Sequence, residues 1–261
     1  ALDAATGKNI WFRHAGGPVR LAPSFWDGRL YFGADDGFVR CVDAGSGATM
    51  WERRVGPRDE RLLGHGKMIS RWPVRTGVLI DGGTAYFGAG IFPGEGVYIE
   101  AANATDGRPI WRNDTCGEPP GSIVSPQGYL LASSAQLFAP LGRVSPASFD
   151  RATGKYQPAA TFGKTIGGGS ALIAGDQLYT GTEEIIAYQP GKKQKVAWLG
   201  GRQLIVKDNI FYVATDKAIV AFDRKEYSAP SVRRFVLRDQ LRTFATEWRA
   251  AEKAEAKIAA E

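Results

Sequence analysis

A chain of 261 residues with 44% hydrophobic residues is long enough to bury a large core. Its 33 Gly and 14 Pro are unusual for a helical protein and common where short strands are joined by tight turns. The net charge is +6, but both signs are mixed along most of the chain, so we expect no nucleic-acid surface. No stretch reaches the roughly 18 uncharged apolar residues of a membrane helix, so we expect no membrane span.

The chain begins without Met and inside a motif, at Ala1-Leu2-Asp3, so we expect a piece of a longer protein. The lack of a visible signal peptide therefore does not indicate the compartment. Only Cys41 and Cys116 are present, and two cysteines define no disulfide framework.

One short motif recurs along the chain, with an Asp or Asn eight positions before a Trp. Its copies are Asp3 to Trp11, Asp43 to Trp51, Asn103 to Trp111, and a weaker Asp150 to Tyr156. The acidic or amide side chain bonds the backbone of the turn that follows, and Gly supplies a positive φ. The indole then lies over the turn of the neighbouring repeat. We assign this docking role to Asp3, Gly7, Trp11, Asp43, Gly47, Trp51, Asn103, Gly107, Trp111, Asp150 and Gly154.

Taken in chain order, residues 8–13 are expected to form a lone outer strand. The first whole unit then has strands at 21–26, 30–34, 38–43 and 48–53, joined by Asp-Gly type turns. One repeat is therefore predicted to be one antiparallel sheet of four strands.

The second unit, residues 72–113, is longer than the first. Trp51 and Trp111 are 60 positions apart, whereas Trp11 and Trp51 are 40 apart. The extra residues fall mainly between Trp51 and Asp81 and around residues 90–96. Because insertions in repeat proteins form rim loops, we expect binding there.

Three further units are expected at residues 121–156, 168–199 and 204–223. The stretch 136–143 fits the template badly, and the last unit shows no fourth strand.

After residue 225 the apolar spacing becomes helical. The apolar positions are Leu237, Leu241, Phe244, Trp248, Ala251 and Ile258. We therefore divide the chain into blades over 1–225 and an amphipathic helix over 226–261. The helix is interpreted as an insertion or linker that packs on the blades or on other sequence, with a coiled coil or a membrane surface as alternatives.

Units of about 40 residues with four strands each favour a β-propeller over a solenoid or a sandwich. The motif resembles that of the PQQ-like repeat family of β-propellers, over roughly residues 1–225. About four to five blades are present, which implies part of a larger ring or an open arc. The resemblance also implies a periplasmic or other extracytoplasmic bacterial protein.

That family contains proteins of different functions. Its quinoprotein dehydrogenases hold pyrroloquinoline quinone and calcium, and a pair of adjacent cysteines stacks on the quinone. Because Cys41 and Cys116 are far apart in sequence, we expect no cofactor here. The quinone with calcium remains the alternative.

No catalytic or metal-binding set can be assembled from the sequence. Asp35-Asp36-Gly37 could hold calcium, but it is also a typical hairpin turn. His14 and His65 lack neighbours at metal spacing, and Ser70 and Ser125 have no evident His and Asp partners.

A cationic channel mouth is a further hypothesis, built on Lys67, Arg71, Arg75 and Arg202. Arg75 and Arg202 both lie six residues before an Asp-containing turn, whereas the offset of Arg20 is seven and predicts the other strand face. The four cations could accept an anionic peptide, glycan or carboxylate; the alternative is that they pair with carboxylates of adjacent blades.

These observations favour a non-catalytic binding or scaffold module that contacts a protein or an anionic ligand at its rim loops or channel mouth. Two alternatives remain: part of a quinone-dependent alcohol or sugar dehydrogenase, and an accessory propeller beside a fused enzyme domain.

Overall fold

The computed structural model describes residues 1–64, 66–118, 124–142, 144–157, 171–181, 184–189 and 194–258. The chain divides into two compact units, Ala1–Asp176 and Gln177–Glu261. Within the described residues, no helix combines the length and the apolar character that crossing a membrane requires.

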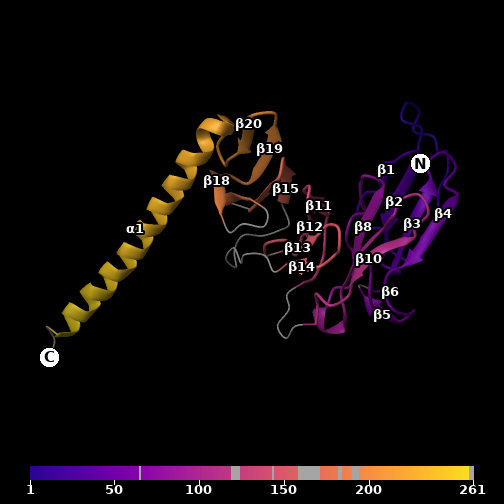
Figure 1. Cartoon of the computed structure of the whole chain (residues 1–261), viewed down its shortest axis with the longest axis horizontal. Coiled ribbons are helices and arrows are strands. Elements are labelled where there is room, and N and C mark those ends of the chain that lie inside the picture. The colour runs from indigo at the N-terminus through magenta and orange to yellow at the C-terminus, as the bar shows by residue number, and fades with distance from the viewer. Residues whose placement is uncertain are drawn as a thin grey trace. The chain divides into compact units, whose positions relative to one another are not determined.

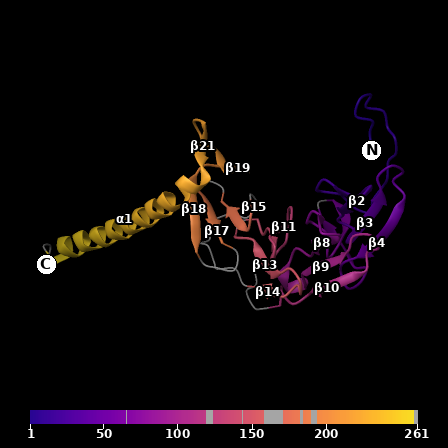
Figure 2. The ribbon, with the colours of Figure 1, turned by 45° about the horizontal axis from the view of Figure 1, so that its top comes forward.

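The first unit contains three antiparallel sheets of four strands each (Figures 1 and 2). The first sheet is β1 (Ser24–Trp26), β2 (Arg29–Gly33), β3 (Phe38–Asp43) and β4 (Thr49–Arg54). The second is β7 (Leu79–Asp81), β8 (Thr84–Ala89), β9 (Tyr98–Asn103) and β10 (Pro109–Asn113). The third is β11 (Leu131–Ala132), β12 (Gln136–Ala139), β13 (Ala147–Asp150) and β14 (Tyr156–Gln157). Each strand pairs with the next in sequence, so the predicted four-stranded blades of an all-β propeller fold are confirmed.

Smaller elements complete the first unit. They are the hairpin β5 (Arg61–Gly64) and β6 (Lys67–Ser70), the 3₁₀ helix η1 (Pro93–Glu95) and β15 (Ala171–Ala174). The hairpin and η1 lie in the two predicted insertions of the second repeat.

Alternation along the strands divides the core into two layers. In β8, Ala85 and Phe87 belong to a core cluster shared with the first sheet, whereas Tyr86 belongs to a cluster shared with the third sheet. Successive side chains of a strand point to opposite faces, so the second sheet is covered on both sides. Stacked blades therefore bury their apolar residues against one another.

The recurring turn has the same geometry in its copies. Asp43 Oδ1 accepts hydrogen bonds from the backbone N–H and the hydroxyl of Ser46, at 2.8 and 2.7 Å. Gly47 then adopts a φ of +72°, which a side chain would disfavour. The turn at Asp150 repeats these bonds with Thr153. These bonds lower the pKa of both aspartates, first through the hydroxyl and then through the backbone N–H.

The indole at the end of each full motif lies on the next turn. Trp11 Nε1 donates to Ala44 O at 3.0 Å, Trp51 Nε1 to Ala104 O at 2.9 Å, and Trp111 Nε1 to Arg151 O at 3.0 Å. A Cβ atom placed on the turn glycine would lie within 3 Å of the indole in each case; these glycines are Gly47, Gly107 and Gly154. The bare glycine thus lets the ring approach the backbone.

The second unit combines strands with one long helix. Its strands are β16 (Gln177–Thr180), β17 (Glu184–Tyr188), β18 (Lys195–Gly200), β19 (Gln203–Lys207), β20 (Ile210–Ala214) and β21 (Ile219–Asp223). The sheet of β19, β20 and β21 has three strands, and α1 (Arg224–Ile258) follows where a fourth strand would begin (Figure 1).

The first turns of α1 pack on β18. Ser231 is buried, and its Oγ accepts a hydrogen bond from Trp198 N at 3.0 Å. The Phe235 ring lies 6.0 Å from the Trp198 ring, and the Arg238 guanidinium lies 4.5 Å from that ring. Arg238 also pairs with Glu184, so both apolar and ionic contacts fix the base of the helix.

Candidate functional site

The two insertions of the second repeat meet in one structure. The Arg71 guanidinium forms ion pairs with Glu60, which precedes β5, and with Glu95 of η1, the latter at 3.2 Å. Trp72 Nε1 donates to Glu95 O at 2.7 Å. We call residues 58–64, 66–71 and 91–96 the rim surface, because these contacts join the two loops that the sequence predicted separately.

The ion pair between Arg71 and Glu60 stabilises the base of the rim surface at neutral pH. The hydrogen bond from Arg71 lowers the pKa of Glu60, and the same bond raises the pKa of Arg71. Both groups therefore stay ionised. The Arg58 guanidinium lies 5.4 Å from the centre of the Trp72 ring and adds a cation–π contact.

The rim surface exposes three large apolar side chains. Leu63 of β5 and Met68 of β6 lie opposite each other in the hairpin register and are 73% and 54% exposed. Phe92, beside η1, is 56% exposed. On the inner face of the hairpin, Ile69 is buried. Exposed apolar side chains on a structured support are a usual feature of protein-binding surfaces.

The turn before β3 anchors the hairpin from behind. The fully buried Asp35 carboxylate accepts bonds from Arg20 Nε at 2.7 Å and from Arg75 Nε at 3.3 Å. Its backbone carbonyl accepts a bond from Ser70 N of β6 at 2.7 Å. Arg20 therefore reaches the same carboxylate as Arg75, although its offset in the sequence predicts the opposite strand face.

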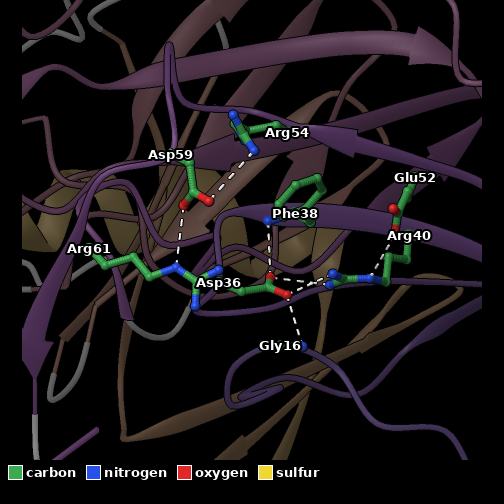
Figure 3. Close-up of polar contacts among 8 residues, drawn as sticks. All are labelled: Gly16, Asp36, Phe38, Arg40, Glu52, Arg54, Asp59 and Arg61. Atoms are coloured by element: carbon green, nitrogen blue, oxygen red, sulfur yellow. Dashed lines mark hydrogen bonds and ion pairs between the residues drawn. The ribbon is translucent and has the colours of Figure 1, made fainter. Parts of the chain in front are cut away.

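The carboxylate of the neighbouring Asp36 is also held by hydrogen bonds from an arginine and from backbone N–H groups (Figure 3). Its carboxylate accepts bonds from Gly16 N at 2.9 Å, Phe38 N at 3.1 Å and Arg40 Nη2 at 2.7 Å. In the same view, Asp59 at the start of the rim surface bonds with Arg61 Nε at 3.3 Å. The carboxylates of the Asp35-Asp36-Gly37 turn are thus occupied by arginines and backbone donors.

The four cations of the predicted channel mouth have different surroundings. Arg71 and Arg75 are held by carboxylates, as described above. Lys67 is exposed on β6, and no carboxylate pairs with it among the described residues. Arg202 belongs to the second unit, where it pairs with Asp216 at 2.9 Å. Of the predicted cations on the rim surface, Lys67 is therefore the one whose charge no described carboxylate offsets, whereas Arg71 is balanced by Glu60 and Glu95.

The described residues do not fit the cofactor that the family resemblance suggests. Cys41 and Cys116 are buried in two different core clusters, so they do not form adjacent thiols. Burial raises the pKa of Cys116 to about 12, so its thiol stays protonated at neutral pH. Within the described ranges, no three His, Cys, Asp or Glu residues gather into a metal site. His65 lies outside those ranges.

Comparisons with known proteins agree with the blade geometry. Residues 1–191 match the PQQ_2 family model, which is described as outer membrane protein assembly factor BamB. The chain belongs to this family. The resemblance inferred from the motif is therefore confirmed, and PQQ_2 blades account for the docked tryptophans of the first unit.

Two solved structures share the fold of this chain. BamB from Moraxella catarrhalis has a TM-score of 0.60 and 18% identity over 84% of this chain and 64% of that chain. Quinohemoprotein alcohol dehydrogenase from Comamonas testosteroni has a TM-score of 0.54 and 14% identity over 85% of this chain and 42% of that chain. At such identities the likeness concerns the fold alone.

Curated relatives of the PQQ_2 chain are partial matches. The dehydrogenase subunit of alcohol dehydrogenase (quinone) from Gluconobacter oxydans (strain 621H) is 33% identical over 134 residues, which is 46% of this chain and 17% of the relative. The corresponding subunit from Acetobacter aceti is 31% identical over 126 residues, 43% of this chain and 16% of the relative. Each match thus spans less than a fifth of the relative.

Proposed function

We propose that this chain is a non-catalytic binding module that holds a protein partner on its rim surface, as part of a larger bacterial protein outside the cytoplasm. The observation that carries the proposal is the exposed pair Leu63 and Met68 on a hairpin that ion pairs hold in place. A fixed apolar surface loses little conformational freedom when it binds.

The chemistry of the rim surface indicates the kind of partner. Leu63, Met68 and Phe92 offer flexible and aromatic contacts to apolar side chains. Lys67 precedes Met68 in β6 and so points to the opposite strand face, where the hairpin turns. There it favours a partner that carries a carboxylate beside its apolar residues, not among them. An apolar protein segment with an acidic flank satisfies both features.

The family relationship supports the cellular setting of this proposal. The PQQ_2 family model carries the description of an outer membrane protein assembly factor. A protein of that kind works in the bacterial envelope on other proteins, and we extend that setting to this chain.

Site-specific photo-crosslinking tests the proposal. A photoreactive residue is placed at Leu63, Met68 or, as the matched control, Phe25, which is 67% exposed on β1. The chain is then exposed to an envelope extract of the organism that makes it. We expect one protein to be captured from positions 63 and 68 and not from position 25.

The captured protein is then purified and titrated with the chain. We expect Leu63→Glu with Met68→Glu to weaken its binding at least about tenfold, and Phe25→Glu to leave it unchanged. Equal capture from all three positions, or equal binding by the two variants, would contradict a partner site on the rim surface.

The alternative of a quinone-dependent dehydrogenase rests on the curated relatives. Its support is limited to a segment that covers between 16% and 21% of those enzymes. The two proposals differ in a measurable property, namely whether the chain itself binds pyrroloquinoline quinone and calcium.

A further inference from the structure

The middle of α1 carries a row of large apolar side chains that no other described element of its own unit covers. Leu237, Leu241, Phe244 and Trp248 are 51%, 68%, 61% and 59% exposed. They are spaced by four, three and four residues, and the small residue Ala251 follows three positions later. We call these four large residues the seam.

The seam does not share a face with the residues that fix the base of the helix. Ser231, Phe235 and Arg238 contact β18 and Glu184. At about 100° per residue, the centre of the seam lies roughly 110° around the helix axis from that docked face. Docking of the helix on β18 therefore leaves the seam open for its full length.

The width of the seam identifies what can cover it. Spacing of four and three residues with two apolar positions per heptad is the pattern of a coiled coil, which packs against another helix. A helix that lies in a membrane surface needs a wider apolar face and a basic polar face. The polar positions of this stretch are of mixed charge instead, since Arg242, Arg249 and Lys253 alternate with Glu247, Glu252 and Glu255.

A second copy of the chain carries the same seam and can pair with it. The charges beside the seam indicate whether the two helices run parallel or antiparallel. In a parallel pair, Glu247 would face the partner's Glu252 twice, and Glu255 would face the partner's Glu255 in the core. In an antiparallel pair centred between positions 242 and 243, Leu241 meets the partner's Phe244. Leu237 then meets the partner's Trp248, and Gln240 lies beside the partner's Glu247.

We infer that α1 pairs antiparallel with α1 of a second copy through Leu237, Leu241, Phe244 and Trp248. Each of these large side chains then meets another large side chain, and the like charges of the parallel arrangement are avoided. The resulting dimer is isologous, because the same four residues serve on both copies. It joins two chains at the helix, independently of the rim surface.

Sedimentation of the 261-residue chain over a concentration series tests the pairing. We expect a monomer–dimer equilibrium, and we expect Leu241→Glu with Trp248→Glu to weaken dimerisation at least about a hundredfold. The matched control is Thr243→Glu with Ala250→Glu, which adds the same charge outside the seam and should leave the dimer intact. All four positions are exposed, so the fold should persist, and circular dichroism checks it.

Two outcomes of this experiment would overturn the pairing. The first is a chain that remains monomeric at every concentration. The second is equal weakening of the dimer by the seam variant and the control variant. Vesicles of anionic phospholipid are added in parallel, and seam-dependent binding to them without dimerisation would assign the seam to a membrane surface instead.

Disulfide trapping tests the direction of the pair. We expect Leu241→Cys and Phe244→Cys chains to cross-link with each other when they are mixed and oxidised, and to cross-link poorly when each is oxidised alone. Efficient cross-linking of each variant with itself would show a parallel pair and overturn the antiparallel inference. The native thiols are buried, so they do not compete.

Discussion

At the scale of single residues, the turn glycines do two separate jobs. Gly7 and Gly107 have nearly the same φ, +69° and +72°. A Cβ on Gly107 would lie 2.8 Å from Cδ2 of Trp51, whereas a Cβ on Gly7 would meet nothing within 4 Å. Gly107 therefore provides both a backbone conformation and room for an indole, whereas Gly7 provides the conformation alone.

We expect Gly107→Ala to destabilise the first unit by about 2–5 kcal/mol. Roughly 1–2 kcal/mol comes from holding Ala in the left-handed region, and roughly 1–3 kcal/mol comes from overpacking against the buried Trp51. Gly7→Ala incurs only the first of these costs, so it should lose about 1–2 kcal/mol. Hydrogen exchange of β4 and β10 in rising denaturant measures both values.

The difference in stability between the two variants measures the contribution of the Trp51–Gly107 contact. Equal losses in Gly7→Ala and Gly107→Ala would show that the indole yields freely, and that the Trp–Gly contact does not determine how the blades stack.

The buried carboxylates are the residues that the sequence could not place. Asp35 is predicted to lie in a hairpin turn, and the turn exists, but its partners Arg20 and Arg75 are 15 and 40 residues away. Glu100 in β9 is fully buried between Arg53 and Arg112. Its burial raises its pKa, and the two arginines oppose that shift. A local sequence pattern can predict a turn. It cannot predict these ion pairs, because they depend on which segments of the chain become neighbours in the fold.

At the scale of elements, one substitution in the repeat explains why the last sheet ends in a helix. Asp223 stands where Asp43 and Asp150 stand, and its Oδ1 accepts bonds from the N–H groups of Lys225 and Glu226 at 2.9 and 3.0 Å. Four positions on, Tyr227 replaces the glycine of the other copies. Without a residue suited to positive φ, the capped turn continues as α1.

The base of α1 should be sensitive to acid. Hydrogen bonding from Arg238 lowers the pKa of Glu184, so the ionised carboxylate favours the docked helix. This contribution is complete above the ordinary glutamate pKa of 4.5 and is lost as the pH falls through the lower pKa of the folded state. Because both side chains are partly exposed, we expect a loss of only about 0.5–1 kcal/mol.

Hydrogen exchange of residues 224–238 measures this prediction between neutral pH and pH values below 4.5. After correction for the intrinsic exchange rate, protection should fall a few-fold in the native chain. In Glu184→Gln it should be lower at neutral pH and nearly constant across that range. An unchanged pH response in the variant would assign the acid sensitivity to other carboxylates.

At the scale of the whole molecule, repetition made the blades predictable and the insertions recognisable. The spacing of Trp11, Trp51 and Trp111 located both rim loops before the structure did. It could not show that Arg71 joins them, because Glu60 and Glu95 lie in different insertions. The badly fitting stretch at 136–143 contains an ordinary strand, β12, since pairing with β11 and β13 outweighs its irregular local pattern.

The positions of the two cysteines determine what we expect of the quinone. A cofactor that stacks on adjacent thiols cannot use Cys41 and Cys116, which lie in separate cores. We therefore expect the chain, titrated with pyrroloquinoline quinone and calcium, to show no saturable change in quinone absorbance and no reduction of a dye by alcohols or sugars. Saturable binding with dye reduction would contradict the binding-module proposal and favour the dehydrogenase alternative. Saturable binding without turnover would place a quinone site on a chain that still lacks catalysis, and the rim variants would show whether the two sites are separate.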